Sequence, residues 1–203
     1  MTSRFLNLVF SPSVKEVQQR HGSREAYGRR DGATEPDRLT ENEAQFIAMR
    51  DSMYMASIGA NGWPYVQHRG GPPGFIKVIN ARSLGIADFR GNRQYVSIGN
   101  LADDSRVALF LMDYPRRARL KILGRARPVD LAHAPDLASA LIDPGSDAKV
   151  ERGIIIDVEA FDWNCPQHIT PRYTLAEIEP SIAALKARIA ELEAEVAKHR
   201  ATA

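Results

Sequence analysis

The sequence has a single cysteine, Cys165, little net charge and no long apolar run. One cysteine excludes an intramolecular disulfide and a cysteine-built zinc site, and it fits a reducing compartment. Lys and Arg number 27 against 25 for Asp and Glu, so the overall cationic field of a nucleic-acid or membrane-surface binder is missing. No apolar stretch approaches the ~20 residues of a membrane span. We therefore expect a soluble, cytoplasmic protein without nucleic-acid or membrane partners, whose redox chemistry, if any, depends on a cofactor.

The 203 residues are enough for one domain with appendages, and we expect three regions. Residues 1–38 are predicted to form an N-terminal arm with a short helix from Ser13 to about Arg20, followed by a Gly-, Arg- and Asp-rich stretch. Residues 39–172 are expected to form the main domain. Residues 173–203 are predicted to be a C-terminal amphipathic helix.

Short runs typical of β-strands, separated by turn residues, dominate the main domain. Asn61 and Gly62 between the first two runs favour a tight antiparallel hairpin, because both residues tolerate a positive φ. Two interruptions are predicted to be helical, from about Asn92 to Leu101 and from about Ala132 to Ile142. Many short strands with few helices indicate a mainly β, α+β fold built on an antiparallel barrel. The runs are Met53–Ile58, Trp63–Arg69, Phe75–Ile79, Leu84–Phe89, Arg106–Met112, Leu120–Val129 and Gly153–Phe161.

Capping boxes predict the start of two helical segments. They are Thr40 with Glu43, and Thr174 with Glu177. After the second box, apolar residues from Leu175 to Val196 alternate at intervals of three and four, which is an a/d heptad seam. Pro180 lies inside this pattern, so the long helix is expected to begin at Pro180 after a short turn. The seam needs a partner, and two remain open: the protein's own barrel, or the same helix of a second copy.

A local anion site is predicted near the middle of the chain. The segment Gln67–Phe75 has three glycines and two prolines and is expected to hold the backbone close to a flat group. Further on, Gly91 permits close approach and Asn92 is expected to cap the next helix. That helix N-terminus, together with Arg90 and Arg93, suits a phosphate monoester. The alternative is that both arginines are ordinary surface charges, and the flanking Gly91 and Asn92 favour the phosphate site.

Several segments, in this order, resemble the flavin-binding proteins related to pyridoxamine 5′-phosphate oxidase. They are Trp63–Phe75, Ala87–Gln94, Gly99–Leu101 followed by Asp104–Leu109, Leu120–Ala126 and the closing segment Trp163–Arg172. The resemblance covers roughly residues 40–172. It implies an FMN-binding split barrel that forms a homodimer, with FMN at the subunit interface. It also implies an FMN-dependent oxidoreductase acting on a small organic substrate, with electrons supplied by NAD(P)H or removed by oxygen.

The resemblance implies cofactor-binding residues and no particular catalytic residue. Gln67, His68 and Arg69 would line the flavin; Arg90, Asn92, Arg93 and Gln94 would hold the phosphate, with Ser97 one turn further on; Arg119 and Lys121 would reach the ring from the same or the facing subunit; Gln167 and His168 would approach from the partner chain. No metal site is expected. The C-terminal substrate-side pattern of the true oxidases is not found, so the substrate does not follow. The alternative function is a non-catalytic flavin or haem binding or sensing module, and a deazaflavin is the alternative cofactor.

Overall fold

The computed structural model describes residues 3–29, 32–145, 148–163 and 166–201. Cys165 lies outside the described residues. The chain divides into two compact units, Met1–Asp113 with Ala118–Pro166, and Tyr114–Arg117 with Gln167–Ala203. The predicted division into an arm, a barrel and a tail stays a prediction.

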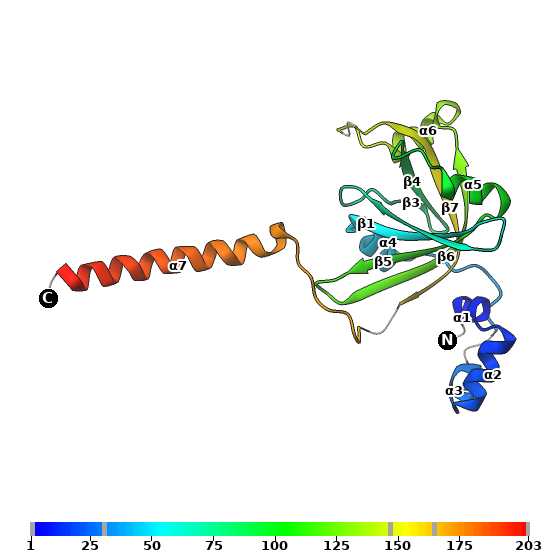
Figure 1. Ribbon diagram of the computed structural model, residues 1–203, viewed down its shortest axis with the longest axis horizontal. Helices are drawn as coiled ribbons and strands as arrows, with labels where there is room; N and C mark the ends of the chain where they lie inside the picture. Colours follow the sequence, from blue (N-terminus) through cyan, green and yellow to red (C-terminus); the bar gives the residue numbers. More distant parts are fainter. Residues whose placement is uncertain (1–2, 30–31, 146–147, 164–165, 202–203) are drawn as a thin grey trace. The chain divides into compact units, whose positions relative to one another are not determined.

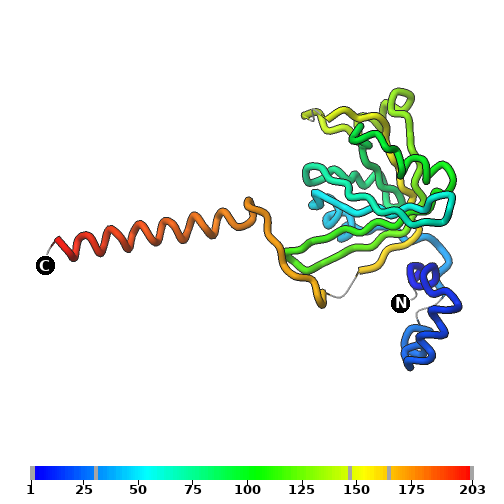
Figure 2. Tube along the Cα trace, viewed as in Figure 1, coloured from blue at the N-terminus to red at the C-terminus, as the bar shows by residue number. Residues whose placement is uncertain are grey.

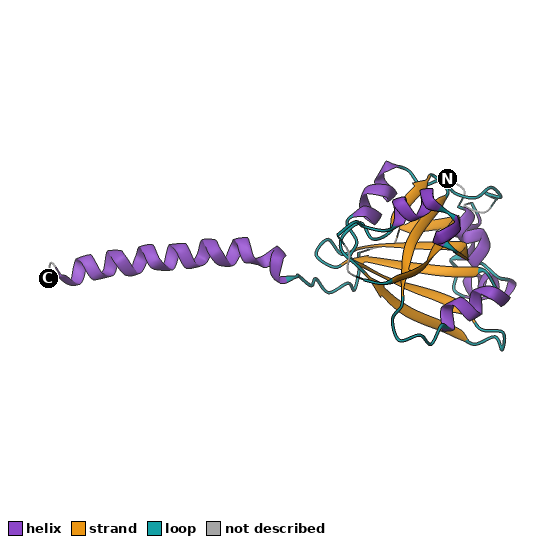
Figure 3. Ribbon diagram, turned by 90° about the horizontal axis from the view of Figure 1, so that it is seen from above, coloured by secondary structure: helices purple, strands orange, loops and turns teal. Residues whose placement is uncertain are grey.

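The described part of the first unit contains one antiparallel sheet of seven strands, in the order β2-β1-β5-β6-β7-β4-β3. Figure 1 labels all of these strands except β2. The strands are β1 Ser52–Ile58, β2 Pro64–Gly70, β3 Lys77–Asn80, β4 Ser83–Phe89, β5 Arg106–Asp113, β6 Ala118–Val129 and β7 Val150–Trp163. Each strand overlaps one of the predicted runs, and the helices of this unit lie at the periphery of the sheet (Figure 3). The predicted fold class, antiparallel β with flanking helices, is confirmed. Strands β2 and β3 form the two edges, and no backbone pairing among the described residues joins them, so closure into a barrel stays a prediction.

The hairpin between β1 and β2 forms as predicted. Gly62 has a φ of 82°, and the Gly59 amide donates to the Trp63 carbonyl at 3.0 Å. The turn sets a register in which Met55 lies opposite Gln67 and Met53 opposite Arg69. Because side chains alternate between the two faces of a strand, this register also decides which side chains of β2 face the inside of the sheet.

The main core is built from alternate residues of neighbouring strands. Met55, Leu109 and Ile122 lie opposite one another on β1, β5 and β6, and all three side chains are fully buried. Helix α4, Glu41–Ala48, adds the buried side chain of Ile47 to this cluster. The core therefore lies on one face of the curved sheet and is covered in part by α4.

The predicted capping box at the start of α4 is confirmed. The Thr40 amide donates to Glu43 Oε2 at 3.0 Å, and the Trp163 indole N–H donates to Glu43 Oε1 at 2.7 Å. Burial raises the pKa of Glu43, but the hydrogen bonds from Thr40 and Trp163 outweigh it, so the pKa is below its ordinary value. The carboxylate thus ties the helix N-terminus to the end of β7.

The N-terminal region contains more helix than we predicted. The expected helix is α2, Pro12–Arg20, whose Ser11 side chain accepts from the Val14 amide. Two further helices, α1 Arg4–Val9 and α3 Arg24–Gly28, lie on either side of it. Phe5 and Leu6 of α1 are buried against Ala160 of β7 and form a second, smaller apolar cluster.

The glycine- and proline-rich turn after β2 does bring the backbone close to a flat group, which is the ring of Phe75 in the same turn. A Cβ added to Gly71 would lie 2.6 Å from the Phe75 Cβ. The Phe75 amide donates to the Pro72 carbonyl at 2.9 Å, and Gly74 has a φ of 86°. The turn is therefore packed on its own aromatic residue.

The second predicted helical interruption consists of a 3₁₀ turn, Leu131–His133, and helix α6, Pro135–Leu141. None of the helices in the described part of the chain combines the length and apolar character that crossing a bilayer demands.

In the second unit, the predicted start of the long helix at Pro180 is wrong. Helix α7 runs without interruption over Leu175–Ala201, with Pro180 inside it (Figure 2). The capping box is confirmed, because the Thr174 amide donates to Glu177 Oε2 at 2.8 Å and the Glu177 amide donates to Thr174 Oγ1 at 3.3 Å. Pro180 lacks the N–H that would reach the Ala176 carbonyl, and its ring crowds that carbonyl. The capped first turn holds the helix in place despite this loss.

Candidate functional site

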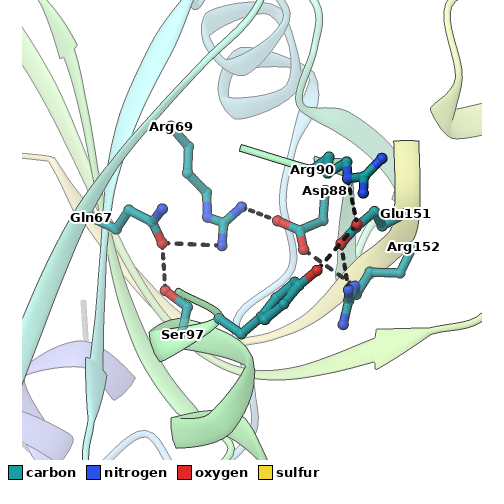
Figure 4. Close-up of polar contacts among 8 residues, drawn as sticks. Gln67, Arg69, Asp88, Arg90, Ser97, Glu151 and Arg152 are labelled. Carbon is teal, nitrogen blue, oxygen red and sulfur yellow. Dashed lines mark hydrogen bonds and ion pairs between the residues drawn. The ribbon is translucent and has the colours of Figure 1, made fainter. Parts of the chain in front are cut away.

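A pocket of about 210 Å³ lies between β2, the end of β4 and the start of the next helix. Its lining residues are Tyr65, Gln67, Arg69, Asp88, Phe89, Arg90, Gly91, Asn92, Arg93, Gln94, Tyr95, Val96, Ser97 and Ile98. Gln67 and Arg69 come from the inward face of β2 and approach Ser97 and Asp88, respectively (Figure 4). The pocket is therefore formed by two separate stretches of the chain, residues 65–69 and residues 88–98.

The loop between β4 and the helix has an unusual backbone. Gly91, Arg93 and Tyr95 have φ values of 44°, 62° and 53°, and helix α5 spans Val96–Asp103. The predicted helix start at Asn92 is wrong, because the left-handed conformations of Arg93 and Tyr95 are incompatible with an α-helix. Asn92 stabilises a turn instead, since its Oδ1 accepts from the Gln94 amide at 3.1 Å. Asn92 therefore stabilises the loop before α5 and does not cap the helix.

The N-terminus of α5 nevertheless opens onto the pocket. Val96, Ser97 and Ile98, which form its first turn, are among the lining residues. Amide groups in the first turn of a helix have no acceptor within the helix, and this end carries a partial positive charge. The predicted combination of a helix start with nearby arginines is present, with the helix beginning four residues later than expected.

Arg69 is fixed in the pocket by two neighbours. Its Nη1 lies 2.6 Å from Asp88 Oδ1, and its Nη2 donates to Gln67 Oε1 at 3.5 Å. Ser97 Oγ donates to the same Gln67 oxygen at 2.7 Å. The guanidinium is therefore held in position, and its buried Nε–H has no hydrogen-bond partner among the described residues.

A second carboxylate, Glu151 at the start of β7, organises the other side of the pocket (Figure 4). Its oxygens accept from the Tyr95 hydroxyl at 3.2 Å and from Arg152 Nη2 at 2.8 Å, and Arg90 Nε lies 3.7 Å away. Burial raises the pKa of Glu151. The hydrogen bonds from Tyr95 and Arg152, with the charges of Arg152 and Arg90, outweigh burial, so the pKa lies below its ordinary value. Glu151 is therefore held in its charged form and positions Tyr95 and Arg90.

Positive charge prevails at this site. Among the described residues, four guanidinium groups gather at or beside the pocket, those of Arg69, Arg90, Arg93 and Arg152, with the carboxylates of Asp88 and Glu151. Arg93 makes a hydrogen bond with the Tyr95 side chain, which raises the pKa of Arg93. Such an arrangement can bind an anion, because charged donors and free backbone amides converge on one cavity.

The structure brings together most of the predicted cofactor residues. Gln67, Arg69, Arg90, Asn92, Arg93, Gln94 and Ser97 all line the pocket.

Three predicted residues lie on the opposite face of the sheet. His68 lies opposite Tyr54, Tyr54 opposite Phe110, and Phe110 opposite Lys121, which makes one cross-strand row. Arg119 lies two residues before Lys121 on β6 and so faces the same side of the sheet. Its guanidinium lies 5.8 Å from the Phe110 ring centre. These positions face away from Gln67 and Arg69, because successive residues of β2 alternate between faces. Their contact with a cofactor stays a prediction.

The remaining predicted residues, Gln167 and His168, belong to the second unit, and their contact with a cofactor also stays a prediction. Lys121 itself pairs with Asp162 at 3.0 Å and lies 4.7 Å from the Phe5 ring centre.

Sequence reasoning missed four residues that organise the site: Asp88, Tyr95, Glu151 and Arg152. Asp88 had a detectable signal, since it is the only charged residue in the apolar run Leu84–Phe89 and is buried. Buried carboxylates are usually paired with a cation. Glu151 and Arg152 had no local signal, because their role depends on the pairing of β7 with β4, where Arg152 lies opposite Asp88.

A model of the pyridoxamine 5′-phosphate oxidase family matches residues 39–152, more than half of the chain. The chain therefore belongs to the pyridoxamine 5′-phosphate oxidase family, a flavin-related family of oxidoreductase type. The matched range contains the whole lining of the pocket. A search of curated proteins finds no match.

Some solved structures are similar to this chain at low sequence identity. An FMN-binding protein from Syntrophomonas wolfei is 10% identical, with a TM-score of 0.48 over 75% of this chain and 95% of that one. A Clostridium acetobutylicum protein related to general stress protein 26, of the pyridoxinephosphate oxidase family, is 12% identical, with a TM-score of 0.47 over 68% and 94%. An F420 reductase is 16% identical, with a TM-score of 0.43 over 61% and 98%.

Proposed function

We propose that this protein is an FMN-dependent oxidoreductase that holds the phosphate of FMN in the pocket at the start of α5. The observation that carries the proposal is the convergence of Arg90, Arg93 and the first turn of α5 on one cavity. A phosphate monoester accepts hydrogen bonds from both kinds of donor, and guanidinium groups match its geometry. Membership of the pyridoxamine 5′-phosphate oxidase family supports a flavin as the bearer of that phosphate.

The size and the donors of the pocket fit one end of such a cofactor. Its volume of about 210 Å³ is below the ~300–1,000 Å³ typical of pockets that hold a whole ligand. It therefore suits the phosphate-bearing end, with the rest of the cofactor extending beyond it. The unused buried donor at Arg69 Nε gives a further reason for a polar ligand here, because buried donors in native proteins are normally satisfied.

The outer face of the sheet supports a homodimer. An apolar hollow there is lined by residues that include Phe5, Tyr54, Val66 and Phe110, and Tyr54 and Val66 are 40% and 59% exposed. Contiguous exposed apolar surface of this kind marks an interaction site. We place a second copy of the chain on this face, with FMN at the subunit interface.

In that dimer, His68, Arg119 and Lys121, which lie on the outer face, would meet the flavin of the facing subunit. Gln167 and His168 are proposed to approach from the partner chain as well. When bound, the flavin supplies the hydride or electron chemistry, and the protein supplies position and electrostatics. The cations of Arg119 and Lys121 would add positive charge beside the ring. The substrate is proposed to be a small organic molecule, with NAD(P)H or oxygen as the second reactant.

The first experiment is to identify what the purified protein carries. We expect a yellow protein whose visible absorbance bleaches on reduction and returns in air, and whose heat-released ligand has the mass of FMN. If the released ligand is a deazaflavin or a haem, FMN is the wrong cofactor in this proposal and the released compound takes its place. A colourless protein that takes up no added FMN would remove the proposal altogether.

The second experiment separates an enzyme from a binding module. An oxidoreductase consumes NADH, NADPH or oxygen in the steady state in the presence of a panel of small organic substrates. Tight FMN binding without turnover across that panel would favour the non-catalytic module instead.

A further inference from the structure

Helix α7 carries an apolar seam that the phosphate site does not use. In heptad notation its a positions are Leu175, Ile182, Ile189 and Val196, and its d positions are Ile178, Leu185 and Leu192. The central side chains of the seam are well exposed: Ile182 by 41%, Leu185 by 64% and Ile189 by 55%. A shallow apolar hollow, lined in part by Ile189, Leu192 and Val196, runs along the C-terminal half. Side chains of this kind at a/d spacing are typical of helices that pack against another helix.

The choice of residues at the a and d positions indicates how many helices pack together. From the second heptad onward, every a position is β-branched, as Ile182, Ile189 and Val196. The d positions of the second and third heptads are Leu185 and Leu192, and the d position of the fourth is His199. In parallel coiled coils, β-branched residues at a with leucine at d favour two strands.

The charges that flank the seam fit a second copy of the same helix. In a parallel pair, a g residue of one helix faces the e residue of the following heptad in its partner. Here g residue Arg188 would face Glu193, and g residue Glu195 would face Arg200. Both pairs have opposite charges, and the twofold symmetry of a homodimer makes each of them twice.

From these observations we infer that α7 pairs with α7 of a second copy of this chain as a parallel, in-register, two-stranded coiled coil. This inference goes beyond the proposed function and does not depend on it. The occupant of the seam is the same helix, since the charges on its two flanks complement one another and a two-stranded core is encoded at a and d.

One antiparallel alignment also pairs opposite charges and has to be separated by experiment. If Ile189 packs opposite Leu192 of the partner, Lys186 faces Glu193 and Arg188 faces Glu195. In that alignment Val196 lies opposite Leu185, so the two Val196 Cα atoms are about 16 Å apart along the axis, from the ~1.5 Å rise per residue. In the parallel pair the two Val196 residues lie in the same layer.

Disulfide crosslinking tests the parallel register in the full-length protein. Val196→Cys in a Cys165→Ser background is expected to crosslink as a dimer within minutes under mild oxidation, because paired a positions bring Cα atoms into disulfide range. The matched control is Ala194→Cys, at the outward-facing f position of the preceding heptad, which is expected to remain largely uncrosslinked. Equal yields from both variants, or no crosslink from Val196→Cys, would overturn the parallel register.

A charge reversal tests the partner's identity and orientation together. In the Val196→Cys background, Arg188→Glu is expected to lower the initial crosslinking rate several-fold, because the introduced carboxylate would face that of Glu193. Adding Glu193→Arg is expected to restore the rate, since each pair again has opposite charges. In the antiparallel alignment the second change would worsen the repulsion, because it places a guanidinium against Lys186. Failure of the double variant to recover would therefore refute the parallel homodimer.

The flavin content of the same variants keeps this inference separate from the proposed function. We expect FMN retention by the Arg188→Glu protein to equal that of the parent, because α7 does not line the phosphate pocket. Normal crosslinking in a protein that binds no flavin would refute the proposed function alone. Normal FMN binding in a protein that does not crosslink through Val196→Cys would refute the coiled coil alone.

Discussion

Replacing Arg93 by glycine is the sharpest test of the phosphate site. Arg93 lines the pocket and has a φ of 62°, so alanine at this position would combine charge removal with backbone strain. Glycine removes the guanidinium and adopts the same backbone conformation freely. The substitution therefore isolates the contribution of the side chain.

The expected effect follows from the exposure of Arg93. A charge-assisted hydrogen bond is equivalent to about a 10- to 150-fold change in Kd. Arg93 is exposed, which places it at the lower end because water competes for the guanidinium, so we expect FMN affinity to fall about tenfold. Riboflavin lacks the phosphate, and its affinity is expected to stay unchanged. Fluorescence titration of the apoprotein with both ligands measures the ratio.

The chain offers a matched control at Arg117. It also has a left-handed backbone, with a φ of 52°, and lies in the turn between β5 and β6, outside the pocket lining. Arg117→Gly makes the same chemical change and is expected to leave FMN binding unaltered. Both variants should keep the parent's Tm to within a few degrees. An equal loss of affinity for FMN and riboflavin in Arg93→Gly, or no loss for either, would refute the phosphate assignment.

Four further substitutions test stability, measured by chemical denaturation. Gly71→Ala is expected to destabilise the protein by ~1–3 kcal/mol, because the new Cβ would lie 2.6 Å from the Phe75 Cβ; Gly99→Ala in α5, where nothing lies within 4 Å, should stabilise it by ~0.5–1 kcal/mol. Ile47→Ala removes a fully buried side chain and should cost ~2–5 kcal/mol. Glu43→Gln should cost ~1 kcal/mol at neutral pH through the weakened cap. The lowered pKa of Glu43 makes its contribution complete above the pKa of an unfolded glutamate and removes it as pH falls through the lowered pKa. The difference between wild type and Glu43→Gln should therefore shrink in acid.

Each of these predictions has a result that would contradict it. If Gly71→Ala leaves the stability unchanged, the turn can move away from Phe75. If Gly99→Ala lowers the stability, other atoms pack against this position of α5, contrary to the open space found there. A cost below ~1 kcal/mol for Ile47→Ala would place that side chain outside the tightly packed core. A Glu43→Gln difference that stays constant down to strongly acidic pH would show that the carboxylate is not what stabilises the start of α4.

Local patterns were enough to predict the sheet and the parts of the site that are contiguous in sequence. The strands follow from alternating apolar residues between turn residues, and the Asn61-Gly62 pair correctly predicted the first hairpin. Gln67 and Arg69 share a strand, and Arg90 and Arg93 share a loop, so their grouping in one pocket required only that β2 and β4 end near each other.

What the sequence could not reveal depends on long-range contacts or on individual backbone conformations. Glu151 reaches the pocket only because β7 pairs with β4. Tyr95 and Arg93 adopt left-handed conformations, which nothing in their side chains requires, so the start of α5 was placed four residues too early. Pro180 suggested a helix start, and the Thr174–Glu177 box just before it turned out to decide where α7 begins.

The pleat of β2 gives the first hairpin an importance beyond its own stability. A slip of one residue in the pairing of β2 with β1 would turn Gln67 and Arg69 outward and point Val66 and His68 toward the cavity. Such a molecule would keep most of its sheet, but it would lose both the inward side chains of the pocket and its apolar outer face in a single step. If the proposed function holds, ligand binding depends as much on the short turn over residues 59–63 as on the arginines themselves.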